Sequence, residues 1–131
     1  MVMPHKAYED AMRRARFHVQ VEVTELDPPQ AWGLPEPLRP KRLHFLAGRV
    51  VRVFRTDGSL ATGDSVIIQV PVVPAGEEPL VDVEGQIDES AIAGLRFFEA
   101  YFDGDPPQLE IAAGLWRPLA GVTNNPLITK G

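Results

Sequence analysis

Cysteine is missing from this chain of 131 residues. Its absence excludes disulfide bonds, thiolate nucleophiles and zinc sites that use cysteine ligands. Long apolar runs are missing too: none approaches the roughly 20 residues of a membrane-spanning helix, and the first 17 residues lack the continuous apolar segment of a secretory signal. We therefore expect a cytoplasmic protein that does not act at a membrane.

Residue types that carry catalysis are scarce. The three serines lie beside turns or loops, and none stands in a Gly-X-Ser-X-Gly sequence. The three histidines show no helical i, i+4 spacing for a metal, and the glycines are spaced for turns rather than for a phosphate-binding loop. The sequence therefore predicts no catalytic residue, no bound metal and no cofactor.

What is present is the composition of one ordinary domain. Hydrophobic residues make up 44% and charged residues 24% of the sequence, which is far from the composition of a disordered chain. A chain of this length buries roughly two-thirds of its unfolded surface around a single core. We expect residues 1–131 to form a single domain.

The formal net charge of −5 is divided unevenly along the chain. Ten of the thirteen Lys and Arg residues, but six of the eighteen Asp and Glu residues, lie in residues 1–55, so this part carries +4 and residues 56–131 carry −9. Basic and acidic strands that lie side by side in one barrel explain this division. A two-faced surface that self-associates or steers a charged ligand is the alternative.

The first forty residues change their periodicity. Residues 5–15 carry apolar side chains at helical spacing, which predicts a short amphipathic helix, and residues 17–24 alternate apolar and polar side chains, which predicts a strand with one buried face. Residues 27–40 contain five prolines and are predicted to form a loop. Trp32 in this loop either anchors the loop to the fold, which we favour, or stacks on a ligand.

Residues 42–56 form the longest expected strand, with apolar side chains on both faces. An interior glycine, Gly48, lets such a strand bend and belong to two sides of a small barrel. Asp57-Gly58 predicts a hairpin turn, and a further strand follows Gly63-Asp64.

The second half has weaker patterns. Residues 75–90 are acidic and predict a solvated connection. Residues 91–102 are ambiguous between helix and strand, and their aromatic density favours a strand from about Leu95 to Phe102, followed by a turn and a strand at residues 108–114. The part of the sequence that is expected to form the core ends near Trp116, and residues 121–131 are expected to form an irregular tail. One helix and five or six strands predict a sandwich or a small barrel.

The run GRVVRVFRTDGSLATGDSVIIQV, followed by GLRFFEAYFDGD, LEIAAG and LWRPL, resembles the five-stranded OB-type barrel, and in particular its netrin/TIMP-like branch. The resemblance covers residues 42–120. The expected fold is therefore mainly β: a small closed or partly open OB-like barrel of five to six strands with one short N-terminal helix. Members of that branch are typically secreted and tied by disulfides, so their protease-inhibiting function is not expected of a chain without cysteine.

The leading functional hypothesis is a non-catalytic binding or interaction module that presents a groove to a protein or a small ligand. Candidate ligand-binding residues are Trp32, His18, His44, Arg52 and Trp116. The alternative is an enzyme or metal site, because His18 and His44 would converge with Glu22 if their strands pair.

Single-stranded nucleic acid is the third hypothesis. It requires a basic groove with exposed aromatic side chains, and Arg49, Arg52 and Arg55 lie along one predicted strand. Strict alternation places Arg52 on the face opposite to the other two, and the net charge of −5 disfavours a polyanion. The sequence also leaves a homodimer open, through an uncovered edge strand or through the opposite charges of its two halves.

Overall fold

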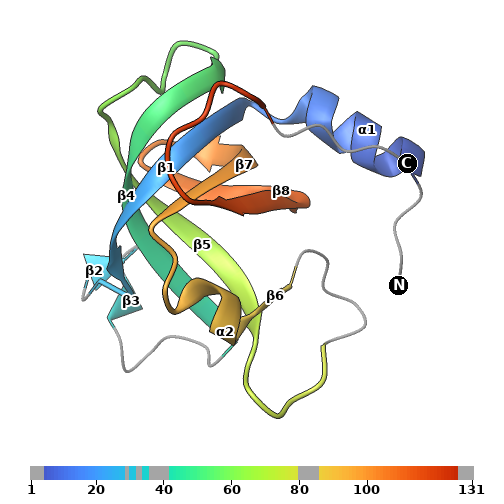
Figure 1. The fold of residues 1–131 in the computed structure, drawn as a ribbon, viewed down its shortest axis with the longest axis vertical. Helices are drawn as coiled ribbons and strands as arrows, with labels where there is room; N and C mark the ends of the chain where they lie inside the picture. Colours follow the sequence, from blue (N-terminus) through green and yellow to red (C-terminus); the bar gives the residue numbers. More distant parts are fainter. Residues whose placement is uncertain (1–4, 29, 32–33, 36–41, 80–85, 127–131) are drawn as a thin grey trace.

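The computed structural model describes residues 5–28, 30–31, 34–35, 42–79 and 86–126. Five strands carry the fold: β1 (Phe17–Leu26), β4 (Leu43–Arg55), β5 (Ser65–Val73), β7 (Phe97–Asp105) and β8 (Gln108–Leu119). The shorter elements are α1 (His5–Arg14), β2 (Gln30–Ala31), β3 (Leu34–Pro35), β6 (Ile87–Asp88) and α2 (Glu89–Ile92). Figure 1 shows α1 projecting from the body and α2 beside the ends of β4 and β5.

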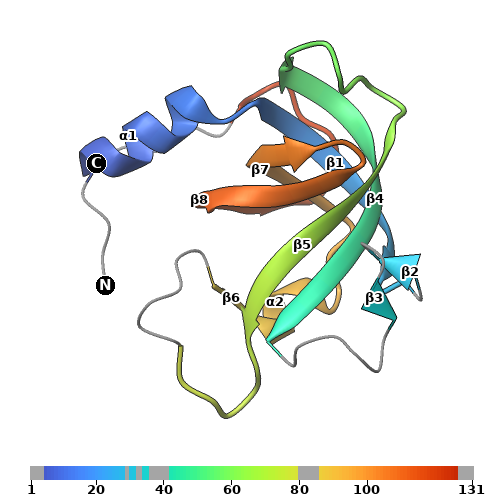
Figure 2. The same ribbon diagram turned by 180° about the vertical axis from the view of Figure 1, so that it is seen from behind.

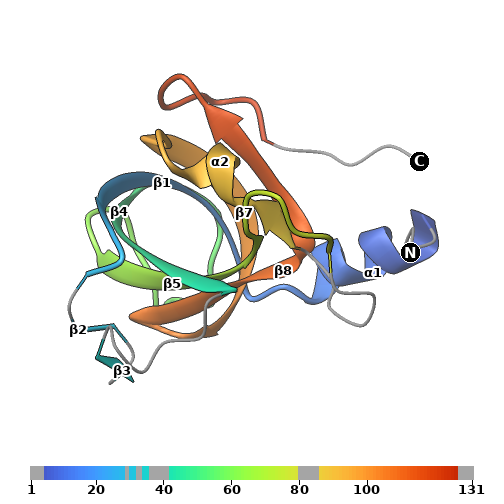
Figure 3. The ribbon, with the colours of Figure 1, turned by 90° about the horizontal axis from the view of Figure 1, so that it is seen from below.

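The five long strands close into a barrel. β1 lies between β4 and β7, β7 pairs with β8, and β8 pairs with β5, which pairs back with β4. Figure 3 shows this ring from below. The β5–β8 pair is parallel over residues 67–69 and 108–110, whereas the other pairs are antiparallel. This closed barrel is compatible with an OB-like barrel, so the predicted mainly β fold with one short N-terminal helix is confirmed.

Alternating apolar residues build the interior, as their periodicity predicts. Phe17, Val19 and Val21 of β1 are fully buried in the core. Phe98 and Phe102 of β7 join them, with their rings edge to face and 5.9 Å between centroids. Burial of each such side chain stabilises the fold by about 1.5–3 kcal/mol. A second, smaller cluster joins α1 to the outside of β7 and β8.

Gly48 lies where β4 pairs with two strands at once, opposite Val23 of β1 and Val66 of β5. A Cβ atom at this position would lie 2.6 Å from Cγ1 of Val21 and 2.8 Å from the backbone oxygen of Glu22. Only glycine therefore lets the two strands approach this closely. The prediction that Gly48 lets one strand serve two sides of the barrel is confirmed, and Figure 2 shows β4 as one long curved ribbon.

β4 and β5 form the predicted hairpin, but Asp57-Gly58 is not a tight two-residue turn. The connection covers residues 56–64, and both Gly58 and Gly63 have a φ of 97°. Leu60 in this connection is buried in the core. Burial of this side chain stabilises the longer connection, which an Asp-Gly signal does not reveal.

The ambiguous residues 91–102 contain both kinds of element. α2 ends at Ile92, and β7 begins at Phe97, slightly later than predicted. β8 is longer than predicted, because residues 115–119 continue it. Residues 27–28, 30–31 and 34–35 of the proline-rich loop are described, but Trp32 lies outside the described residues. Residues 121–126 of the tail are irregular, as predicted, and residues 127–131 lie outside the described part.

Candidate functional site

The two candidate histidines lie at opposite ends of the β1–β4 pair. His18 is opposite Arg55, whereas the far end of the ladder pairs Leu26 with Leu46, and His44 lies beyond that end. The intervening part of β4 measures about 35 Å along the strand. The two side chains also lie on different faces of the barrel wall. His18 alternates with the core residues of β1 and so lies on the outer face, whereas His44 is two residues from the core residue Leu46 and so lies on the inner face. The structure therefore does not bring His18 and His44 together.

Glu22, the third residue of the enzyme or metal hypothesis, lies on the outer face of β1. Its carboxylate pairs with Arg49 of β4 at 3.0 Å. Within the described residues, no three His, Asp or Glu side chains form a group that could hold a metal ion. The convergence of His18, His44 and Glu22 that this hypothesis requires is thus not formed.

Trp116 packs inward. Its ring contacts Phe98 edge to face, with 6.4 Å between centroids, and it packs against the barrel core. This is the environment of a half-buried core residue rather than of a ligand-stacking platform. Trp32, the other candidate tryptophan, lies outside the described residues.

A polar row crosses the outer face of the barrel. The register places Arg52 of β4 beside Gln20 of β1, Gln20 beside Glu99 of β7, and Glu99 beside Arg117 of β8. We call these four residues the outer-face row. Gln20 and Glu99 are fully buried although they lie on the side of the wall away from the core. Buried polar groups of this kind require partners, and most of them are found within the row.

Glu99 is the centre of the outer-face row. Its carboxylate accepts hydrogen bonds from Gln20 Nε2 at 3.1 Å and from Arg117 Nη2 at 3.0 Å, and it lies 2.5 Å from Nε2 of His18. These partners offset the cost of burying a carboxylate. Sequence analysis missed Glu99, whose signal is one acidic residue inside the aromatic run of residues 97–102.

His18 is held between aromatic rings next to Glu99. Its ring stacks on Tyr101 with 3.9 Å between centroids and lies 4.9 Å from Phe54. Burial lowers the pKa of His18 below its usual 6.5; the Glu99 carboxylate opposes this shift, and the charges of nearby arginines add to it. His18 is therefore neutral at pH 7, and its Nε2–H donates to Glu99.

The three arginines of β4 share the outer face, so the alternation that placed Arg52 opposite to Arg49 and Arg55 is wrong. The arginines are three residues apart, but their partners on β1 are only two apart. Two register shifts in the β1–β4 ladder each take up one extra residue of β4. The sequence signal is the run RVVRVFR, in which two apolar residues separate successive arginines.

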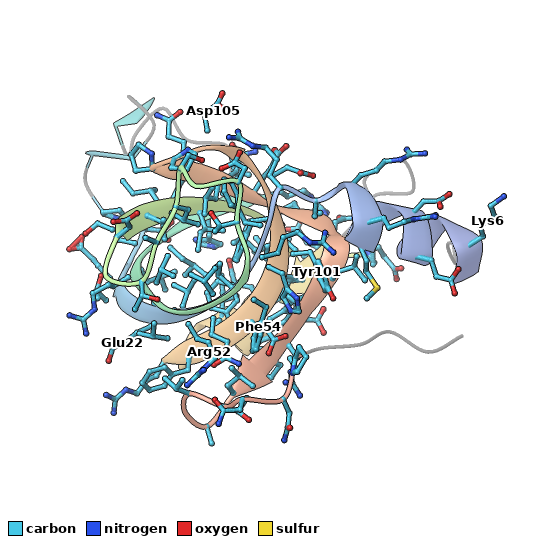
Figure 4. The ribbon with its side chains drawn as sticks, turned by 90° about the horizontal axis from the view of Figure 1, so that it is seen from above. Lys6, Glu22, Arg52, Phe54, Tyr101 and Asp105 are labelled. Carbon is cyan, nitrogen blue, oxygen red and sulfur yellow. The ribbon has the colours of Figure 1, made fainter. Side chains whose placement is uncertain are left out.

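Arg52 differs from its two neighbours on β4. Arg49 donates to Glu22 at 3.0 Å, and Arg55 donates to three backbone carbonyl groups at the end of α1. Within the described part of the chain, Arg52 has no hydrogen bond or ion pair, and its Nε atom is buried without a partner. Figure 4 shows Arg52 and Phe54 on the same side of the barrel. Arg52 is thus a half-buried cation that meets no carboxylate among the described residues.

The segment after β8 covers part of the outer-face row. The side-chain amide of Gln20 pairs with the backbone of Thr123 in both directions: Nε2 donates to the oxygen at 2.8 Å, and Oε1 accepts from the nitrogen at 3.0 Å. Arg117 donates to the backbone oxygen of Asn125. Figure 1 shows this segment, in red, crossing over β1. It bonds Gln20 and one Nη atom of Arg117 but makes no hydrogen bond to Arg52 within the described residues.

A second polar group closes the other end of the barrel. His44 lies between two carboxylates, with Nδ1 bonded to Asp27 and Nε2 bonded to Glu89 at 2.8 Å. We call Asp27, His44 and Glu89 the barrel-end cluster. Burial alone would lower the pKa of His44, but the two carboxylates together outweigh it and raise the pKa above 6.5. Because the two ring nitrogens point in opposite directions, the carboxylates cannot converge on one metal ion.

No family model, no curated protein and no solved structure matches this chain. The resemblance to the netrin/TIMP-like branch is therefore unsupported by relatives, and the fold rests on the strand pairing. Among the described residues, no helix is both long and apolar enough to cross a membrane. The cytoplasmic location stays a prediction.

Proposed function

We propose that the protein is a non-catalytic binding module of the OB type, and that it holds an anionic group of its ligand at Arg52 on the outer face of β4 and β1. The observation that carries this proposal is the half-buried guanidinium of Arg52, which has no partner among the described residues although both neighbouring arginines of β4 have theirs.

An anion at Arg52 would complete the outer-face row. A guanidinium presents a planar fork of donors that fits a carboxylate or a phosphate, and charge-assisted hydrogen bonds are stronger than neutral ones. Nε itself is buried from solvent, so a ligand oxygen would bond the Nη atoms of the half-buried guanidinium, where a hydrogen bond to a partly desolvated charge is worth more than at an exposed arginine. Phe54, two residues along the same strand, supplies an apolar contact beside the charge.

The surroundings of the histidines favour binding over catalysis. His18 is 5% exposed and stacked on Tyr101, so a substrate has little access to its ring. Both nitrogens of His44 already contact carboxylates. A general base needs a free nitrogen within reach of a substrate proton; the nitrogens of His44 are both bonded, and the ring of His18 is buried.

Thermal unfolding with simple anions tests the proposal, because a ligand that binds only the folded protein raises its melting temperature. Phosphate, sulfate, acetate and succinate are compared at constant ionic strength. At least one of them is expected to stabilise the protein, and Arg52→Gln should abolish that shift. The control is Lys6→Gln, which removes the same charge from an exposed position at the far end of α1. Equal shifts in the Arg52 variant and the native protein would contradict the proposal.

Single-stranded nucleic acid is a second candidate, favoured by the common face of Arg49, Arg52 and Arg55. Two of these cations are already partnered within the chain, and the net charge is −5. Retention on a single-stranded DNA column at low salt, lost in Arg52→Gln, would support this candidate. Flow-through of the native protein would remove it.

A further inference from the structure

Polar contacts hold the segment after β8 on the outer-face row. We call residues 120–126 the C-terminal strap. Within the described residues, its hydrogen bonds to the barrel are those of Thr123 with Gln20 and of Asn125 with Arg117. Val122 is 46% exposed, and neither apolar cluster of the described core includes a residue of the strap. A segment with so few buried contacts opens at a small cost in free energy.

Gln20 recognises the C-terminal strap by its main chain. Its Oε1 accepts the N–H of Thr123 at 3.0 Å, and its Nε2 donates to the C=O of the same residue at 2.8 Å. Every residue other than proline presents these two groups, so the contact does not depend on the threonine side chain. Gln20 is fully buried and also donates to Glu99, which fixes the orientation of its amide. The outer face thus has a preformed site for the backbone of one residue.

Arg52 lies directly beside this site. It is the register partner of Gln20 in the β1–β4 pair, and residues in such positions have Cβ atoms about 4.5–5.5 Å apart. Thr123 presents the neutral C=O of an internal residue to Gln20, and within the described residues Arg52 bonds no atom of the strap. A residue that ends a chain has a carboxylate in place of that C=O, with a second oxygen and a negative charge. A guanidinium fits such a group well.

We infer that the outer-face row binds the C-terminal residue of a partner peptide, and that the C-terminal strap occupies the same site as an internal competitor. In the bound state, the last residue of the peptide takes the place of Thr123. Its N–H donates to Oε1 of Gln20, one carboxylate oxygen accepts from Nε2 of Gln20, and the other accepts from the guanidinium of Arg52. This inference rests on the proposed function and names its ligand.

The charges of the outer-face row favour one added carboxylate. The row contains two guanidinium groups, those of Arg52 and Arg117, and one carboxylate, that of Glu99. Arg117 already pairs with Glu99 at 3.0 Å, which weakens the repulsion between Glu99 and a second carboxylate nearby. Residues 120–126 are all uncharged, so the strap leaves the row with an excess positive charge. A terminal carboxylate removes this excess.

Peptides that copy the strap test the inference. The probes are acetyl-Ala-Gly-Val-Thr with a free carboxylate, which reproduces residues 120–123, and the same peptide with a C-terminal amide. Binding is followed by NMR titration. The acid should bind about tenfold more tightly than the amide, because one charge-assisted hydrogen bond is worth about this ratio. Arg52→Gln should abolish the difference between the two peptides, whereas the control Lys6→Gln should retain it.

A variant of the strap tests the competition. Thr123→Pro removes the N–H that Gln20 accepts and should raise the affinity for the acid peptide about fivefold, because a strap with one hydrogen bond fewer is open more often. Thr123→Ala keeps this N–H and should bind as the native protein does. In the native protein, the N–H of Thr123 should exchange faster with solvent when the peptide is bound. Melting temperatures of the variants confirm that each is folded.

Three results would overturn the inference. If acetate shifts the Arg52 signals but the acid peptide binds no more tightly than its amide, the proposed function stands and recognition of a terminal residue is wrong. If neither acetate nor the acid peptide binds, both are wrong. If the acid peptide binds through Arg52 while the N–H of Thr123 stays protected and Thr123→Pro gains no affinity, the strap is not a competitor.

Discussion

The outer-face row and the barrel-end cluster each surround a histidine, yet they shift its pKa in opposite directions. His18 is 6% exposed in its side chain and meets one carboxylate with two arginines nearby, so burial dominates and its pKa falls. His44 is 21% exposed in its side chain and meets two carboxylates, so its pKa rises. Burial and the balance of facing charges decide the outcome, not the residue type.

The comparison also separates a structural cluster from a candidate site. At the barrel end, the ring of His44 is bonded to both Asp27 and Glu89, which ties β4 to α2 and to the residue that follows β1. On the outer face, Arg117 pairs with Glu99 although its Nε is buried without a partner, whereas Arg52 meets no carboxylate among the described residues. A ligand is therefore expected on the outer face, where one charge has no counterpart among the described residues.

The largest expected effect comes from Glu99→Gln. Removing the buried charge leaves Arg117 without its carboxylate, and we expect the free energy of unfolding to fall by about 3 kcal/mol. Glu89→Gln at the barrel end removes a more exposed carboxylate and should cost less than about 1 kcal/mol. Urea unfolding at pH 7 measures both, with Glu110→Gln as an exposed control. Equal losses for Glu99 and Glu89 would show that the two clusters do not differ.

Gly48→Ala should lower the free energy of unfolding by about 2 kcal/mol, because the new Cβ would clash with Val21 and with the backbone of Glu22. Gly48 lies on β4 between the two clusters, so this change should leave the order of the two histidine pKa values intact. Gly94→Ala, where a Cβ meets nothing within 4 Å, is the control. Urea unfolding measures the stability. A loss in the control as large as that in Gly48→Ala would sink the steric explanation.

Stability should depend on pH with opposite signs at the two histidines. The folded pKa of His18 is below 6.5, so its contribution is present above pH 6.5 and is lost as the pH falls toward the folded pKa. The folded pKa of His44 is above 6.5, so its contribution is present below pH 6.5 and is lost as the pH rises through the folded pKa.

NMR titration of the two imidazole rings reads these directions directly. Unfolding is measured across pH 5–8, about the range in which histidine titrates. His18→Gln should reduce the loss of unfolding free energy as the pH falls, and His44→Gln should reduce the loss as the pH rises. Two shifts of the same sign would contradict the comparison.

The smallest effect is expected at Arg52. Because Arg52 has no partner among the described residues, Arg52→Gln should change the free energy of unfolding by less than about 0.5 kcal/mol. Arg55→Gln removes hydrogen bonds to the end of α1 and should cost about 1 kcal/mol. Thermal unfolding compares them. A marked loss of stability in Arg52→Gln would mean that Arg52 serves the fold.

The strands and the helix could be predicted because their periodicity is local. The alternation at residues 17–24 reflects the single buried face of a strand, and the interior Gly48 reflects the close approach of two strands. Both signals can be read from the local sequence. The site depends instead on register. Whether His18 meets His44 or Glu99 is decided by strand pairing far along the chain, which alternation does not specify.

The common face of Arg49, Arg52 and Arg55 was missed for a related reason. Strict alternation assumes an unbroken ladder, and two register shifts changed the phase of β4 between Arg49 and Arg55. The doubled apolar pairs Val50-Val51 and Val53-Phe54 marked these shifts in the sequence. A period of three inside a strand therefore indicates bulges rather than two faces.

The most direct test of the account observes the buried Nε–H of Arg52 by NMR while phosphate or succinate is added at constant ionic strength. The account predicts that this proton shifts, because an anion bound at the same guanidinium changes its electrostatic environment, while the Nε–H groups of Arg49 and Arg55 move little. An Arg52 Nε–H that stays unchanged by every anion, or shifts no more than those of its two neighbours, would contradict the claim that this residue holds the ligand.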